Sequence, residues 1–243
     1  METFIIFYVL LFIVAFLYAS VGHGGASGYL ALMALYGIAP AVMKPTALLL
    51  NIFVSLISFI QFYKARHFNW KIFLPLALAS LPLAFMGGLM VINGDVYKKI
   101  LGFLLLLPII RFAFFSNTDV TEMKKPSVVL SVVIGGTIGL LSGMIGIGGG
   151  IILSPILLLL KWTNQKQTAA ISALFIFVNS LAGLGGQLVK GIEFNSSMIG
   201  YVAVALVGGL LGSWLGASKF NQPVLRKILA TVLLIAAIKL ITI

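Results

Sequence analysis

The chain has 243 residues, of which 61% are hydrophobic and only 9% are charged, and it has no cysteine. A soluble domain of this size carries charge on roughly a quarter of its residues. The composition therefore excludes a soluble globular protein, and the missing cysteine excludes disulfides and thiolate metal sites. The net charge of +11 comes from basic residues that lie between apolar runs. That distribution argues against nucleic-acid binding and fits the positive-inside rule.

Ten apolar segments predict an all-α integral membrane protein. No positive stretch precedes the first one, so we expect a membrane helix there rather than a signal peptide. The second and seventh segments have only about a dozen residues, too few to cross a core of ~30 Å at ~1.5 Å per residue. We expect these two to be short oblique or re-entrant helices. In chain order the segments are 3–20, 26–37, 46–63, 72–92, 98–115, 128–145, 150–161, 168–189, 197–216 and 223–242.

The basic residues predict the orientation of the chain. Of the 16 Lys and Arg residues, 11 fall in one set of alternating connections. By the positive-inside rule this set faces the cytoplasm, and both termini lie on the non-cytoplasmic side of the cell membrane. The opposite set holds Lys44, Lys98, Lys99, Lys190 and Lys239.

The two halves of the chain resemble each other. Gly22-His23-Gly24-Gly25 parallels Gly146-Ile147-Gly148-Gly149, and two further blocks match in the same order: 61–64 with 187–190, and 98–101 with 226–229. These matches predict a first membrane repeat (1–115), a linker (116–127) and a second membrane repeat (128–243). Five segments per repeat is an odd number, so the repeats should have inverted topology. This arrangement is typical of secondary transporters that bind substrate near the midplane.

A glycine-rich break precedes the short segment of each repeat. Each glycine costs a helix roughly 1 kcal/mol relative to alanine. Non-helical backbone at membrane depth is tolerated only where protein or a watery cavity satisfies it. The short helices beginning near Ala26 and Gly150 should direct their N-termini at these breaks, which makes each break a candidate anion site. Four other glycine pairs are expected to serve helix packing: Gly87-Gly88, Gly135-Gly136, Gly185-Gly186 and Gly208-Gly209.

The acidic residues indicate the charge of a substrate. All five lie at a terminus or in a connection, and none lies in the middle of an apolar segment. A cation carrier is expected to bury at least one carboxylate. The pattern therefore favours an anion or a neutral solute. The five residues are Glu2, Asp95, Asp119, Glu122 and Glu193.

Polar side chains recur on one face of the third segment in each repeat. Asn51 and Ser55 are followed by Ser58 at helical spacing, and Thr168, Ser172 and Asn179 share a face in the same way. Such side chains either bind an oxyanion or form hydrogen bonds between helices. Gln61 and Gln187 occupy matching places near the ends of the two segments.

His23 is the only titratable residue in either break. Its charge can change near neutral pH, so it is a candidate for proton coupling or substrate binding. A structural, hydrogen-bonded histidine is the alternative. No acid pair, nucleophile–base pattern, metal-ligand spacing or phosphate loop is present in the sequence. We therefore expect neither an enzyme nor a bound cofactor or metal.

The sequence resembles the sulfite exporter TauE/SafE family of membrane transporters. The residues that carry the resemblance are the two glycine motifs, Ser154-Pro155, and the stretches Thr46 to Asn69 and Ser172 to Asn195. It implies a duplicated permease that exports sulfite, sulfonates or related small organic anions. The first motif departs from the second, because Ala26 stands opposite Gly150 and Ala31 opposite Pro155.

These observations predict a secondary transporter that holds a small anion, such as sulfite or an organosulfonate, at the glycine breaks near the midplane. Alternating access is the expected mechanism, with protons as a candidate coupling ion and export implied by the resemblance alone. An anion-selective channel and a non-transporting scaffold or assembly factor remain alternatives. The expected partners are the anion and the lipid bilayer. The candidate binding residues are Gly22, His23, Gly24, Gly25, Ser27, Asn51, Gln61, Gly148, Gly149, Gly150, Ser154, Ser172, Asn179 and Gln187.

Overall fold

The computed structural model describes residues 2–20, 25–114, 123–192 and 196–216, together with 231, 234, 237–238 and 240–242. All regular secondary structure in these ranges is α-helical, which confirms the predicted fold class. Gly22, His23 and Gly24, part of the linker, and most of the tenth predicted segment lie outside the described residues. The helices are α1 (Glu2–Ser20), α2 (Ala26–Leu35), α3 (Pro40–Lys64), α4 (Trp70–Leu89), α5 (Gly94–Phe114), α6 (Val128–Ile145), α7 (Gly150–Leu159), α8 (Gln165–Val189) and α9 (Ser196–Gly216).

Helix lengths agree with a multi-pass membrane protein. By length and composition, α3, α4, α6 and α8 can each cross a membrane. In contrast, α2 and α7 have 10 residues each, roughly 15 Å, or half of the hydrocarbon core. The two short helices were therefore predicted correctly, including their starts at Ala26 and Gly150.

Three long helices begin three or more residues earlier than predicted. The prediction placed the starts of α3, α5 and α8 at 46, 98 and 168, but they begin at Pro40, Gly94 and Gln165. Pro40 suits the first turn, where its missing N–H is not needed. Asn164 caps α8 in a capping box with Gln167. As a consequence Lys44, which the prediction placed in a connection, lies inside α3 and is only 7% exposed.

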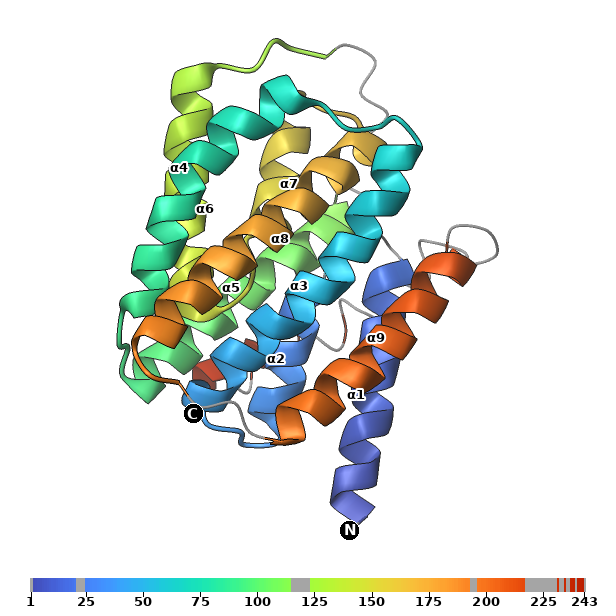
Figure 1. Cartoon of the computed structure of the whole chain (residues 1–243), viewed down its shortest axis with the longest axis vertical. Helices are drawn as coiled ribbons and strands as arrows, with labels where there is room; N and C mark the ends of the chain where they lie inside the picture. The colour runs from blue at the N-terminus through green and yellow to red at the C-terminus, as the bar shows by residue number, and fades with distance from the viewer. Residues whose placement is uncertain are drawn as a thin grey trace.

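The helices pack as a bundle in which α3 and α8 lie between two outer pairs (Figure 1). One outer pair is α1 with α9, and the other is α4 with α6. In sequence order, α1 and α4 of the first half correspond to α6 and α9 of the second half. The α1–α9 pair therefore corresponds to the α6–α4 pair. Glycines make both pairs close: a Cβ on Gly87 would meet the carbonyl of Leu140, and one on Gly208 that of Phe12. At least one glycine of every predicted packing pair meets neighbouring backbone in this way, including Gly88, Gly135 and Gly186.

Hydrogen bonds between connections define two ends of the bundle. At one end the backbone N–H of Lys124 donates to the carbonyl of Lys161 (2.8 Å). At the other, the Lys190 ammonium donates to the carbonyl of Met90 (3.3 Å). Each bond joins two connections that the distribution of Lys and Arg residues predicts to lie on the same side of the membrane.

Candidate functional site

Both short helices start from a glycine in the left-handed conformation. The N-cap of α2 is Gly25, with φ 74° and ψ −5°. The N-cap of α7 is Gly149, with φ 78° and ψ −18°. Neither N-cap residue provides a side-chain cap. Among the described residues, the first N–H groups of both helices therefore have no side-chain acceptor, and the positive ends of the two helix dipoles lie at Gly25 and Gly149.

In the second break, the backbone at Gly148 lies against the polar faces of α3 and α8. Gly148 has φ 72°, a conformation that side-chain-bearing residues rarely adopt. A Cβ added to Gly148 would lie 2.6 Å from Nδ2 of Asn51 and 3.1 Å from Oγ of Ser180. The predicted non-helical backbone is thus present in the second break, and it lies directly beside two polar side chains.

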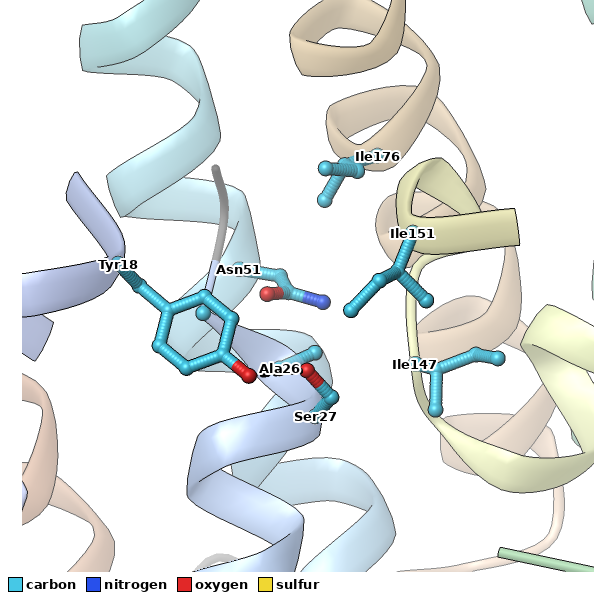
Figure 2. A pocket seen from close by; sticks show the side chains of 8 residues that line it. Tyr18, Ala26, Ser27, Asn51, Ile147, Ile151 and Ile176 are labelled. Atoms are coloured by element: carbon cyan, nitrogen blue, oxygen red, sulfur yellow. Dashed lines mark hydrogen bonds between the residues drawn. The ribbon is translucent and has the colours of Figure 1, made fainter. Parts of the chain in front are cut away.

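A small cavity lies between the two breaks (Figure 2). Its volume is about 10 Å³, which is room for about one water molecule. An oxyanion of four or more heavy atoms fits there only if the surrounding side chains or helices move apart. The lining residues come from both halves: Tyr18, Gly25, Ala26, Ser27 and Asn51 from the first, and Ile147, Ile151 and Ile176 from the second.

Asn51 is the central polar residue of this cavity. Its side chain extends from α3 towards the three isoleucines in Figure 2. The residue is fully buried, and within the described chain neither its Nδ2 nor its Oδ1 has a hydrogen-bond partner. The hydroxyl of Ser180, which also lies beside Gly148, is likewise buried and has no partner among the described residues. Because leaving a buried polar group unpaired costs about 1–3 kcal/mol, these groups are ready to bind a polar ligand.

Tyr18 and Ser27 form the opposite wall. Their hydroxyl oxygens are 2.7 Å apart and share a hydrogen bond that joins α1 to the first turn of α2. Both residues are buried. This bond fixes the start of α2 relative to α1, and so it positions the N–H groups of that turn.

Other predicted site residues lie away from the cavity. Ser154 and Ser172 hydrogen-bond each other (2.8 Å), and Ser154 also donates to the carbonyl of Gly150 (2.8 Å). These two serines join α7 to α8. Asn179 donates to the carbonyl of Phe175 (2.8 Å), while its Oδ1 is buried without a partner.

The two glutamines lie still further from the cavity. Gln61 is exposed near the end of α3, and Gln187 is buried near the end of α8. Each is ten or eleven residues beyond the cavity residue of its own helix, roughly 15 Å along the axis. The structure therefore does not bring either glutamine to the cavity.

Several residues of the cavity or its edge were not predicted. Tyr18 lines the cavity and lies about one turn before the first break. Ser180 lies beside Gly148 and directly follows the predicted Asn179. Both residues could have been found from the sequence, because each has a hydroxyl group close to a predicted glycine break or binding residue. The isoleucines carry no such signal in a chain that is 61% hydrophobic.

The comparisons with known proteins identify the family. Residues 7–240 match the family described as Sulfite exporter TauE/SafE. The chain therefore belongs to this family of membrane transporters. It is similar to a probable membrane transporter protein of Sinorhizobium fredii, with 35% identity over 95% of both chains. It is also similar to one of Methanocaldococcus jannaschii, with 30% identity over 66% of this chain and 61% of the relative. No solved structure matches the chain.

Proposed function

We propose that the protein is a secondary transporter of a small oxyanion, such as sulfite or an organosulfonate, which binds between the two glycine breaks. One observation carries the proposal: the unpartnered side chains of Asn51 and Ser180 flank Gly148 beside the N-termini of two short helices. Amide and hydroxyl groups can donate to anionic oxygens, as can the free N–H groups of a helix start. Asp95, the one carboxylate whose side chain is described, is exposed at the start of α5.

The apolar lining strengthens these contacts. Ile147, Ile151 and Ile176 exclude water from one side of the cavity. In such surroundings a hydrogen bond to an anion is electrostatically stronger than in water. Two helix dipoles and a few neutral donors can then hold an anion without a buried counter-ion, which also allows its release.

Alternating access is the mechanism we propose for this site. The cavity walls belong to different halves, with Tyr18 and Ser27 on one side and Ile147 and Ile151 on the other. Rocking one half against the other would expose the cavity first to one face of the membrane and then to the opposite face. The correspondence of the outer helix pairs when the halves are exchanged supports the inverted repeat. Export follows from the family resemblance, and coupling to protons through His23 remains part of the proposal.

An aromatic cluster supports the proposed orientation. Phe68 lies at the corner between α3 and α4, with its ring centroid 4.9 Å from that of Trp70, 5.2 Å from that of Phe59 and 6.0 Å from that of Tyr63. Aromatic residues gather at membrane interfaces, and basic residues gather on the cytoplasmic side. Lys64, Arg66 and Lys71 belong to this corner, so we assign this end of the bundle to the cytoplasm and both termini to the opposite side.

A ligand screen on the detergent-purified protein tests the proposal. Melting temperatures are measured with sulfite, sulfate, thiosulfate, taurine, sulfoacetate and simple cations. A ligand that binds only the folded state stabilises it by about 2.7 kcal/mol at a hundred times its dissociation constant. We expect one sulfur oxyanion to stabilise the protein, and Asn51→Leu to abolish that effect in a protein that still folds. Stabilisation by cations alone would contradict the proposed anion site.

Flux measurements in proteoliposomes separate the transporter from its alternatives. A carrier shows counterflow, in which unlabelled sulfite inside drives uptake of labelled sulfite from outside. An anion channel conducts far faster and shows no counterflow, and a scaffold shows neither flux nor stabilisation by any oxyanion. We expect saturable uptake with counterflow.

A further inference from the structure

Lys44 is a cation inside the bundle with no carboxylate partner among the described residues. It is 7% exposed, and its ammonium lies 5.5 Å from the centroid of the Tyr97 ring. The Tyr97 hydroxyl is not directed at the lysine, because it donates to the carbonyl of Ile145 (2.9 Å). The ring gives Lys44 a cation–π contact, but none of the described residues supplies a negative charge that would neutralise it.

A second cation lies at the same end of the bundle. A Cβ on Gly183 of α8 would be 3.5 Å from Leu48, one turn after Lys44, and α8 ends where α3 begins (Figure 1). Lys190, the C-cap of α8, holds its ammonium 3.3 Å from the carbonyl of Met90. Burial disfavours the charge on Lys44 most, and the like charge of Lys190 disfavours it further. The two lysines come from different halves of the chain, so the fold itself brings them to one end. Two ammonium groups with no carboxylate beside them among the described residues are the arrangement that a small anion, above all a doubly charged one, would neutralise.

The face of α3 that carries Lys44 leads to the cavity. Lys44, Leu48 and Asn51 follow one another at i, i+4 and i+7, so they lie on one side of the helix. A Cβ on Gly146 would be 3.2 Å from the Cα of Lys44, just as Gly148 lies against Asn51. This face of α3 therefore lies along the second break. It leads from Lys44 to the cavity at Asn51, a distance along the helix axis of seven residues, roughly 10 Å.

We propose that Lys44 and Lys190 form an outer binding subsite for a small oxyanion, which exchanges between this subsite and the cavity at Asn51. The inference rests on the proposed transport function and adds a second binding site for the transported anion. In the part of the chain that the structure describes, the matching position of α8 carries no lysine. The fifth residue of α8, which corresponds to Lys44 as the fifth residue of α3, is Ala169. Beside it, the hydroxyls of Thr168 and Thr163 are 2.7 Å apart and satisfy each other.

Side-resolved kinetics of the full chain in proteoliposomes test the subsite. The apparent KM for labelled sulfite is measured separately from each face of the membrane. We expect Lys44→Met to raise KM at least tenfold from the face that carries Lys44, while kcat and the KM from the opposite face change less than twofold. Lys190→Gln should raise the same KM about threefold. The control is Lys64→Gln, which removes an exposed charge at the other end of α3 and should leave both values unchanged.

The possible outcomes separate the two proposals. Wild-type protein that neither moves nor binds any oxyanion would contradict the transport function itself. Wild-type flux with an unchanged KM in both lysine variants, or with an equal change from both faces, would overturn the subsite alone. If Lys44→Met fails to fold, Lys190→Gln decides the question, because Lys190 is an exposed residue.

Discussion

Two groups of buried polar side chains flank the second glycine break, and they differ in whether their hydrogen bonds are complete. On the α7 side, Ser154 and Ser172 satisfy each other and the carbonyl of Gly150. Where α3 and α8 meet Gly148, Asn51 of α3 and Ser180 of α8 are equally buried but have no partner in the described chain. A satisfied buried pair stabilises the fold, whereas an unsatisfied one lowers stability and is retained for another reason. We interpret the first group as structure and the second as the binding site.

The largest expected effect comes from the glycine between the two unpartnered side chains. In Gly148→Ala the new methyl group would press on Asn51 Nδ2 and on Ile176, and the left-handed backbone adds strain of about 1–2 kcal/mol. We expect sulfite flux to fall at least a hundredfold. The control is Gly37→Ala, which has a similar φ of 70° but no atom within 4 Å of the added Cβ. An equal loss of flux per folded molecule in both variants would assign the effect to backbone strain rather than to the site.

Asn51→Leu is the sharpest test of the unpartnered group. The substitution replaces an unsatisfied amide by an apolar side chain of similar size, so the melting temperature should stay the same or rise. The apparent KM for sulfite should rise at least tenfold, because the central donor of the cavity is lost. Thermal unfolding and flux are measured on the same preparation. A clear fall in melting temperature would indicate that Asn51 has a structural partner instead.

Ser172→Ala should give the opposite pattern. It removes one hydrogen bond between α7 and α8, so we expect a loss of about 1 kcal/mol in stability. Flux per folded molecule should remain within twofold of the wild type, because this serine does not line the cavity. A KM change as large as that of Asn51→Leu would erase the distinction between the two groups.

The smallest expected effect is that of Tyr18→Phe. The variant loses the hydrogen bond to Ser27 and loosens the first turn of α2, while keeping the aromatic ring in place. We expect KM to rise about threefold with little change in melting temperature. A Ser27→Ala variant should show the same change, and the double variant should add nothing further if the two hydroxyls act as one unit.

Much of the fold followed from the sequence because its signals are local. Hydrophobic length determines which segments cross the membrane, and the glycine runs interrupt the helices, so that α2 and α7 start directly after Gly25 and Gly149. The starts of α3 and α8 were predicted too late. In α3 the first turn contains Lys44, a polar residue that becomes buried only through tertiary packing.

The candidate site could be predicted only in part. Glycine breaks and polar helix faces identified Gly25, Ser27, Asn51 and Gly148 as candidates, and the structure brings these four to the cavity or its edge. Ser154 and Ser172 have the same residue type and a similar helical position. Whether a serine has a partner depends on which helix packs against it, and spacing along one helix does not contain that information.

The sequence alone determined that this protein is an all-helical membrane protein with two short helices behind glycine breaks, since composition and helix termination are properties of each segment. Tertiary structure decided which polar groups are left without partners. It also decided that Lys44 and Lys190, 146 positions apart, lie at the same end of the bundle. The physical reason is that hydrogen-bond satisfaction and charge proximity depend on contacts between distant segments, and those contacts exist only when the helices are packed.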